Sequence, residues 1–435
     1  MDFLKKSTAL WALATVPIIH AHTLFTNFFV DGVGQGNGTC IRMNDNPSQA
    51  SFPIPNIESN DMACGIHGMH GVSRVCPIPA GSLLTFEFRS WAADRTKPRL
   101  DSSHKGPCAV YMKKVSSAVS DTATGAGWFK IWDQGFDAAS GKWCTETLIA
   151  NGGLLSVNIP QGVQRGYYLL RPELLALHNA GNRDPQFYVG CAQVFVEGGG
   201  DMVPVDMVSI PGYVTYGEPA VAFNIWKQPM DLPYPIPGPR VARFEHAGAV
   251  ANTVQDEGLR PDGCIMENGN WCGFEVDDYS DEAGCWAAGE QCWDQNQDCW
   301  DSAPPTGGRG CELWAQKCKA LNAACKARNF NGPPNRGRYL TPERETIAPP
   351  VPRATGGGSE VFPSERSGLA SVSVSRGYQG PDPVATAGPT SAGYTHEISE
   401  LAPEATRAPV RVVTVYETDV ETDWVTVTVR RGLRA

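Results

Sequence analysis

The stretch Leu83-Leu84-Thr85-Phe86-Glu87-Phe88-Arg89 is a short run of residues that favour β-strands. Comparable runs follow at residues 109–115, 155–159, 166–171 and 191–197, and residues typical of turns separate them. Few long helical patterns lie between these runs, so residues 22–243 are expected to form an all-β domain, an antiparallel β-sandwich. A proline-rich stretch at 229–239 indicates an extended exit from this domain.

The amino-terminal residues 1–21 are expected to be a signal peptide. Lys5 and Lys6 precede an apolar stretch, and Ala21 is a small residue suited to cleavage. This apolar stretch is too short for a stable membrane span, and no later stretch is apolar enough, so we expect no membrane partner. The protein is therefore predicted to be secreted and extracellular, with Asn37-Gly38-Thr39 as a usable glycosylation site at Asn37.

The charge balance bears on possible partners. The chain has 36 Lys and Arg against 46 Asp and Glu, a formal net charge of −10. Nucleic-acid binding would favour a basic face, so nucleic acid is not expected as the main partner. A neutral glycan remains open, because its recognition needs no net charge. A hydrolase is not supported, because glycoside hydrolases use two placed carboxylates and only Glu58 and Asp61 are candidates, by proximity alone.

Residues 256–334 contain eight of the 14 cysteines, a density typical of a small disulfide-rich module. Six of them form two trios with a spacing of seven residues, close to two helical turns, so each trio lies along one face of a helix. Two antiparallel helices with these faces opposed predict a helical hairpin with the disulfides Cys285–Cys325, Cys292–Cys318 and Cys299–Cys311, and leave Cys264–Cys272 to close a short loop. A zinc module is the rival interpretation, but its usual shorter cysteine spacing is missing.

Each cysteine of the first trio is followed by a tryptophan: Trp286, Trp293 and Trp300. These tryptophans form a second stripe about 100° around the helix from the cysteines. The stripe could bind glycan, or it could pack against the partner helix or the first domain. Residues 335–435 are rich in Pro, Gly, Ser, Ala and Thr and are expected to be a low-complexity, mostly disordered tail, in which 410–429 could form a strand or a hairpin.

Cleavage after Ala21 would leave His22 with a free α-amino group. An amino-terminal histidine can chelate one metal ion through this amine and a ring nitrogen. One further imidazole would complete a set of three nitrogens, which suits copper. The pair His67 and His70 also has a spacing found among metal ligands, but the glycines between and around them favour a flexible loop.

Several segments resemble one family in the same order along the chain. The start His22-Thr23-Leu24-Phe25, followed by Val30-Asp31-Gly32, is similar to the mature start of the lytic polysaccharide monooxygenases of auxiliary activity family nine (formerly glycoside hydrolase family sixty-one). The segments at 60–64, 103–107, 174–178, 186–193 and 210–213 also resemble this family. The resemblance covers about residues 22–228.

The resemblance implies an immunoglobulin-like or fibronectin-like sandwich that binds one copper ion per chain on a flat face. It implies that His22 and His104 are the copper ligands, with Tyr188 in the axial position. His178 and Gln186 would then form a polar shell around the oxidant, as catalytic residues with Tyr188. Tyr213 matches a family segment and is expected to contact substrate, and Trp91, in a loop before His104, is a further candidate for substrate contact or, equally, for packing.

The resemblance also implies a Cys64–Cys191 disulfide. Of the pairings open to the other four cysteines of the first domain, Cys40–Cys76 with Cys108–Cys144 is preferred. The implied function is oxidative cleavage of cellulose or a related β-glucan by a monomer that uses dioxygen or hydrogen peroxide and an external electron donor, either a small molecule or a dehydrogenase. A non-catalytic copper-binding protein and a cell-wall-associated protein on the same fold are the alternatives.

Overall fold

The computed structural model describes residues 22–250, 252–352, 412–414 and 426–428. The chain divides into two compact units, Met1–Phe362 and Pro363–Ala435. The predicted signal peptide and most of the predicted tail lie outside the described residues. Within the described part of the chain, no helix is both long and apolar enough to cross a membrane.

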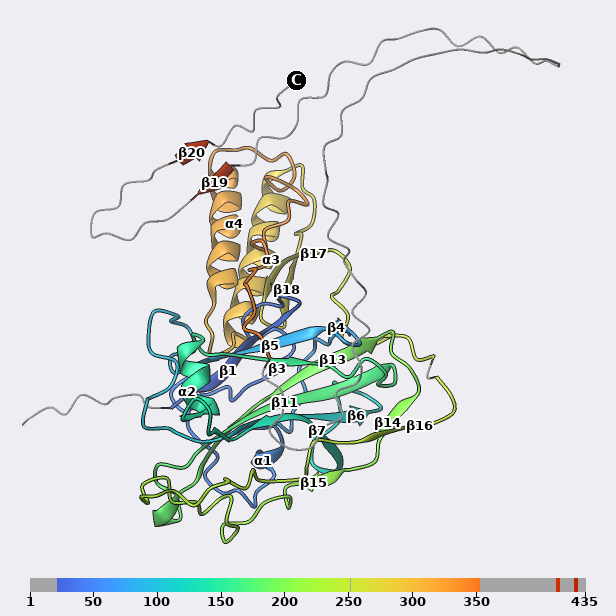
Figure 1. Cartoon of the computed structure of the whole chain (residues 1–435). Helices are drawn as coiled ribbons and strands as arrows, with labels where there is room; N and C mark the ends of the chain where they lie inside the picture. The colour runs from blue at the N-terminus through green and yellow to red at the C-terminus, as the bar shows by residue number, and fades with distance from the viewer. Residues whose placement is uncertain (1–21, 251, 353–411, 415–425, 429–435) are drawn as a thin grey trace, which may run out of the picture. The chain divides into compact units, whose positions relative to one another are not determined.

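The first domain is a β-sandwich of two sheets (Figure 1). The smaller sheet has the order β10 (Leu154–Asn158), β5 (Leu83–Arg89), β1 (Leu24–Val30), β2 (Val33–Gly34). The larger has the order β15 (Val208–Ile210), β7 (Gly125–Gln134), β6 (Cys108–Val115), β11 (Gly166–Ala176), β13 (Cys191–Glu197), β3 (Ile41–Arg42), with β12 (Gln186–Val189) beside β11 and β4 (Cys76–Pro79) beside β13. All five predicted runs are strands. The pairing is antiparallel except for β4 with β13, which is parallel and departs from the prediction.

Two apolar cores cover the two faces of the larger sheet. Phe86 and Phe88 of β5 meet Leu170 and Leu174 of β11 between the sheets. On the outer face, a second core lies under loops and the short helix α1 (Asp61–Cys64). Since β11 is buried along its whole length, it is a fixed support for the residues that follow its carboxyl end.

Smaller elements complete the domain: β8 (Phe136–Asp137), β9 (Lys142–Trp143), α2 (Cys144–Ala150), a 3₁₀ turn η1 (Ala180–Asn182), β14 (Met202–Pro204) and β16 (Phe244–His246). Strand β16 pairs with β14, and Ala247 N donates to Asp201 O. The ordered domain therefore continues a few residues past the predicted boundary at 243.

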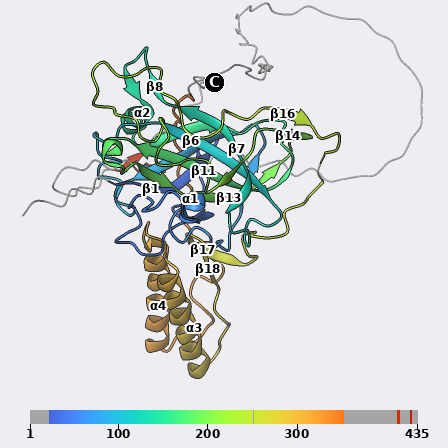
Figure 2. The same ribbon diagram turned by 90° about the horizontal axis from the view of Figure 1, so that it is seen from below.

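The cysteine-rich module consists of a β-hairpin and a helical hairpin. Its elements are β17 (Cys264–Asn268), β18 (Trp271–Phe274), α3 (Glu282–Asp301) and α4 (Arg309–Lys326). Figures 1 and 2 both show α3 and α4 side by side, with β17 and β18 near the sandwich. The side chain of Asp281 caps α3 by accepting a hydrogen bond from Gly284 N at 2.8 Å. The predicted helical hairpin is thus present.

The fourteen cysteines form seven disulfides, and none is free. The pairs are the same seven that the sequence analysis gave: Cys40–Cys76, Cys64–Cys191, Cys108–Cys144, Cys264–Cys272, Cys285–Cys325, Cys292–Cys318 and Cys299–Cys311. Cys264–Cys272 closes a short loop as expected, and it does so by joining the paired strands β17 and β18.

The module is joined to the sandwich by hydrogen bonds and one ion pair. Arg74 Nη1 lies 2.7 Å from Glu267 Oε1, and both side chains are largely buried. Cys40 N donates to Asn270 Oδ1 at 2.8 Å. Asn37, the predicted glycosylation site, lies at this junction with its residue surface exposed, and its Oδ1 accepts from Arg89 Nη2. Glycosylation at Asn37 stays a prediction.

Residues 335–352, assigned to the tail by their composition, pack as an extended segment. Leu340 N donates to Ile265 O in the module. Further along, Gly34 N donates to Glu345 O and Ile347 N to Gly32 O. Without this segment, backbone groups along the edge of β2 would lack partners. The segment pairs with them as an added strand pairs with an exposed sheet edge. Composition alone could not predict this packing, because the composition of a segment does not show that a sheet elsewhere in the fold has a free edge.

The second unit contains a short strand pair among its described residues. β19 (Val412–Thr414) pairs antiparallel with β20 (Thr426–Thr428), with Val412 opposite Thr428. This agrees with the hairpin that the alternating Val and Thr residues allowed at 410–429.

Candidate metal centre

The predicted site residues come from separate segments that meet at one end of the sandwich. His22 directly precedes β1, His104 lies in the loop that leads into β6, and His178 follows β11. Tyr188 and Gln186 lie on β12, opposite Leu174 and Ala176 near the carboxyl end of β11. Strand pairing therefore brings together residues that are far apart in sequence.

Three rings surround one point at nearly equal separations. The ring centroids of His22 and His104 are 6.2 Å apart, those of His22 and Tyr188 6.1 Å, and those of His104 and Tyr188 6.0 Å. The separation of the two imidazoles leaves room for one metal ion held at ~2 Å by a nitrogen of each ring. Tyr188, buried beneath the two histidines, closes the third side.

His104 is buried, and its Nε2 has no hydrogen-bond partner in the described part of the chain. Its Nδ1 lies 3.3 Å from Ser103 Oγ. Burial, with the neighbouring His178, lowers the pKa of His104 to about 4 against the opposing effect of Asp101. The imidazole is therefore neutral at neutral pH, which is the form that binds a metal. An unpaired buried nitrogen is costly unless a ligand satisfies it, so this atom fits a metal ligand.

The imidazole ring of His178 packs against that of His104. Their ring centroids are 4.2 Å apart, with 32° between the ring planes. Nδ1 of His178 is also buried without a partner among the described residues, and burial lowers the pKa of His178. A neutral imidazole in this position can donate or accept one hydrogen bond at the site.

Tyr188 and Gln186 form a hydrogen-bonded pair beside the histidines. Tyr188 OH donates to Gln186 Oε1 at 2.7 Å, and Gln186 Nε2 donates to Asp184 Oδ2 at 3.3 Å. Burial raises the pKa of Tyr188, so the phenol stays protonated. The pair fixes which way the Gln186 amide points.

Within the described residues, no group of three or more His, Cys, Asp or Glu side chains could hold a metal ion. The predicted ligand set has only two such side chains, His22 and His104, and takes its third nitrogen from a backbone amine. That amine is free only when the chain begins at His22. Side-chain geometry alone therefore cannot complete this site.

Of the two predicted substrate contacts, Tyr213 has its polar end in the interior. Its hydroxyl is buried, donates to Glu173 Oε2 and accepts from Arg171 Nη2 at 3.1 Å. Its ring packs against Tyr111 with a centroid separation of 5.6 Å. Only the ring of Tyr213 is partly exposed. Its hydroxyl is used in the hydrogen bonds to Arg171 and Glu173 of β11.

Trp91 lies at the same end of the sandwich as His22. Leu24 of β1 pairs with Arg89 of β5 in an antiparallel arrangement. His22 lies two residues before Leu24 and Trp91 two residues after Arg89, so both lie beyond the same end of this strand pair. Thr23 Oγ1 donates to Arg99 O at 2.8 Å, which holds the loop that contains Trp91 close to the amino-terminal segment. Trp91 is exposed, as a surface contact requires.

Two exposed aromatic residues at the site were missed by the sequence analysis. The Phe52 ring lies 5.0 Å from the His22 ring and is 45% exposed. Trp226 is 61% exposed, and its indole nitrogen donates to His178 O at 2.9 Å. Both lie in loops, Phe52 before Pro53 and Trp226 shortly before Pro229. A lone aromatic in a loop is too common a pattern to have pointed to the site.

Comparison with known proteins places these residues in context. Residues 22–234 match the model of "Auxiliary Activity family 9 (formerly GH61)". The match begins at His22, the residue that the sequence analysis placed at the mature amino terminus.

Curated relatives extend the similarity. The chain is 50% identical over 363 residues to "AA9 family lytic polysaccharide monooxygenase C" of Aspergillus tamarii, covering 80% of this chain and 95% of that protein. It is 46% identical over 377 residues to "AA9 family lytic polysaccharide monooxygenase H" of Botryotinia fuckeliana, covering 82% and 85%. Matches of this length are too long to end before α4, so they run through the cysteine-rich module as well as the sandwich.

A solved structure, "CvAA9A", is 34% identical, covers 51% of this chain and 97% of that one, and has a TM-score of 0.46.

Proposed function

This chain belongs to Auxiliary Activity family 9 and is a copper-dependent polysaccharide monooxygenase, and from that premise we propose that it is a secreted, monomeric enzyme that cleaves cellulose or a related β-1,4-glucan. The observation that carries the proposal is the triangle of His22, His104 and Tyr188 rings at the residue where the family match begins. We also infer that the sandwich is of the immunoglobulin-like kind, which its two facing, mainly antiparallel sheets support.

The groups that would hold copper are the amine and Nδ1 of His22 and Nε2 of His104. Support comes from the buried, unpartnered Nε2 of His104 and from the ring separation of 6.2 Å. Bound copper supplies one-electron redox chemistry with dioxygen or hydrogen peroxide. Signal cleavage after Ala21 is required, because the amine of His22 is otherwise part of a peptide bond. A glycan on Asn37 would be added in the same secretory pathway.

Three side chains, Tyr188, Gln186 and His178, surround the proposed copper position. Burial raises the pKa of Tyr188, so it remains a neutral phenol and would keep water away from the buried side of the bound copper. Its hydrogen bond directs the Gln186 amide, and His178, stacked on His104, presents a neutral imidazole on the other side. When copper is bound, the Gln186 amide and the His178 imidazole would be available to hydrogen-bond to the oxidant.

The substrate would lie across the exposed aromatics around the site. Phe52 beside His22, Trp226 beside His178 and Trp91 beyond the end of β5 offer ring faces to sugar rings. Tyr213 contributes only through the exposed part of its ring, since its hydroxyl is engaged with Arg171 and Glu173.

The test uses secreted, copper-loaded protein whose amino terminus has been verified as His22. It is incubated with amorphous cellulose, with and without ascorbate, and soluble products are analysed by mass spectrometry. We expect reductant-dependent oligosaccharides that are heavier by one oxygen atom, or lighter by two hydrogen atoms, than native ones. Bound copper with no oxidised product from several β-glucans would support the non-catalytic copper-binding alternative instead, and failure to bind copper would overturn the assignment of the ligands.

A further inference from the structure

The cysteine-rich module carries a row of tryptophans that the catalytic site does not use. Trp286, Trp293 and Trp300 lie on α3 with a spacing of seven residues. With a rise of ~1.5 Å per residue, neighbours in the row are about 10.5 Å apart along the helix axis. The row therefore spans about 21 Å in all.

The disulfides fix the direction in which this row faces. Each tryptophan directly follows a cysteine that is bonded to α4: Cys285, Cys292 and Cys299. A free α-helix drifts by about 20° per seven residues, so such a row would otherwise slant around the helix. Three covalent links at this spacing hold one face of α3 against α4 and thereby keep the tryptophans on one side.

The two ends of the row are open to solvent. Trp286 is 37% exposed and Trp300 45%, whereas Trp293 is partly buried against the module's core. The ring of Trp300 lies on the backbone of Gly308, where an added Cβ would come within 2.3 Å of Trp300 Cζ3. Glycine at 308 lets the indole lie flat on the chain, so one ring face is supported and the other can be offered to a ligand.

A polar group at the contact between α3 and α4 lacks a partner. Asn322 of α4 has a buried Oδ1 with no hydrogen-bond partner in the described part of the chain. This atom would lie 2.7 Å from a Cβ placed on Gly289, which lies between Trp286 and Trp293 on α3. Because this oxygen is buried against α3, it belongs to the contact between the two helices and not to the exposed face of the row.

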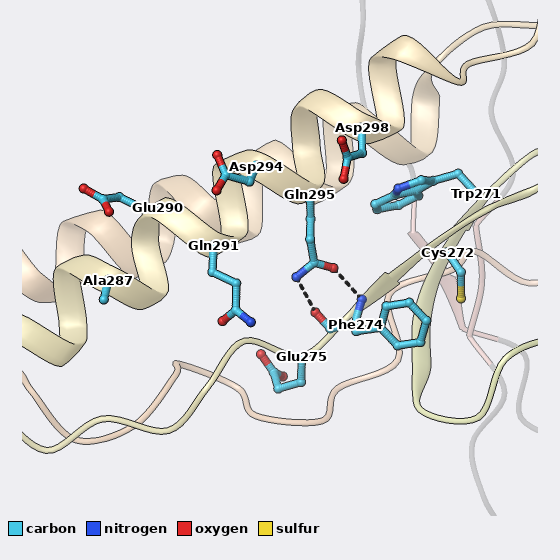
Figure 3. A pocket seen from close by; sticks show the side chains of 10 residues that line it. All are labelled: Trp271, Cys272, Phe274, Glu275, Ala287, Glu290, Gln291, Asp294, Gln295 and Asp298. Carbon is cyan, nitrogen blue, oxygen red and sulfur yellow. Dashed lines mark hydrogen bonds between the residues drawn. The ribbon is translucent and has the colours of Figure 1, made fainter.

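The opposite side of α3 is already occupied by the fold. A groove there of about 540 Å³ is lined by Trp271, Phe274 and polar residues of α3 (Figure 3). In it Gln295 holds the backbone of Phe274 with two hydrogen bonds, and Gln291 Oε1 accepts from Asp277 N. None of the three tryptophans lines this groove. The amides of Gln295 and Gln291 in this groove attach β18 and the residues after it to α3. The tryptophan row is therefore the better candidate for a binding surface.

We propose that the tryptophan row of α3 binds a β-1,4-glucan chain of cellulose, laid lengthwise along the helix. Alternate sugar rings of such a chain face the same way, and two of their repeats come close to the roughly 21 Å between the exposed Trp286 and Trp300, so these two rings can stack on sugar rings in register. Exposed apolar rings at a fixed spacing mark a binding surface when a rigid scaffold holds them. The choice of cellulose among glycans with this repeat rests on the proposed function.

Binding is tested with the full secreted protein, copper-free and without reductant, on microcrystalline cellulose. The double variant Trp286→Ala/Trp300→Ala is expected to bind on the order of tenfold more weakly, and the residual binding reports the sandwich face. Trp286→Tyr/Trp300→Tyr is expected to retain most of the affinity, which separates lost stacking from lost folding. Phe274→Ala, an exposed aromatic on the groove side, is the matched control and should bind as the parent protein does.

Three results would overturn the proposal. One is an unchanged affinity of the double alanine variant, and another is an equal loss in Phe274→Ala. The third is binding of the parent protein through these tryptophans to chitin but not to cellulose. Oxidised products from soluble cello-oligosaccharides are measured in parallel on the copper-loaded variants. Their absence from the parent protein would count against the proposed function and leave the binding result standing.

Discussion

The sandwich and the helical hairpin hold their exposed aromatic side chains by different means. In the sandwich, Phe52, Trp91 and Trp226 come from three distant loops and meet only because buried strands position those loops. In the hairpin, Trp286 and Trp300 lie on one helix whose phase is set by disulfides next to them in sequence. The sandwich face thus depends on the whole domain, whereas the hairpin face depends on a few covalent links.

The largest expected effect is in the sandwich, at Arg171. Its guanidinium is fully buried, lies 2.6 Å from Glu173 Oε2 and donates twice to Met62 O. Arg171→Leu leaves the buried Glu173 carboxylate without its charged partner, so we expect a loss of about 3–5 kcal/mol in the free energy of unfolding. Denaturant unfolding followed by circular dichroism measures this loss.

The matched control for Arg171 is Arg240→Ala. Arg240 pairs with Asp206 at 3.2 Å on the surface, and such a pair contributes at most about 1 kcal/mol. If Arg171→Leu proved as mild as Arg240→Ala, the positions of the sandwich loops would not depend on this buried network, and the contrast with the hairpin would weaken.

The next effect is in the hairpin, at its middle disulfide. Cys292→Ala/Cys318→Ala removes a link between residues 26 apart, which is expected to cost about 3 kcal/mol. We expect hydrogen exchange to rise in α3 and α4 and cellulose binding to fall, with the sandwich unaffected. The control is Cys264→Ala/Cys272→Ala, which opens the β-hairpin but leaves the links of α3 intact. Equal weakening of cellulose binding in the control would contradict the idea that the helix links orient the tryptophans.

At the catalytic end, His104→Ala tests whether the site depends on residues from separate segments. Losing one of two imidazoles is expected to reduce copper affinity at least ~100-fold, measured by calorimetry on protein that begins at His22. His67→Ala is the control, because the His67 side chain is exposed and pairs with Asp45 at 2.6 Å, away from the copper site. Similar copper binding in both variants would exclude His104 as a ligand, while binding to cellulose through the hairpin should be unchanged in either.

The two regions also differ in how far sequence predicts them. The hairpin follows from local spacing alone, because seven-residue repeats of cysteine specify both the helices and their pairing. The expected copper-site residues His22, His104 and Tyr188 were predicted through resemblance to a family, since nothing in local spacing says that segments eighty residues apart will meet. Phe52 and Trp226 were missed for that same reason: their place beside His22 and His178 is decided by loop packing. The hydroxyl of Tyr213 turned out to be inside because Arg171 and Glu173, buried on β11, need a partner.

The smallest effect concerns the start of α3. Asp281 caps the helix by accepting from Gly284 N at 2.8 Å, one turn before the first of the three helix disulfides. Asp281→Ala is expected to cost about 1 kcal/mol in the unfolding of the module, and Asp281→Ser very little, because serine is also a good cap. Hydrogen exchange of the first turn measures the effect, with the exposed Asp294→Ala as the control. If Asp281→Ala left the first turn as protected as before, the disulfide at Cys285 would hold the helix start by itself, and Trp286 would owe its position to covalent links alone. A local loss of protection around Trp286 would instead show that the hairpin, like the sandwich, also relies on non-covalent contacts to place its aromatic face.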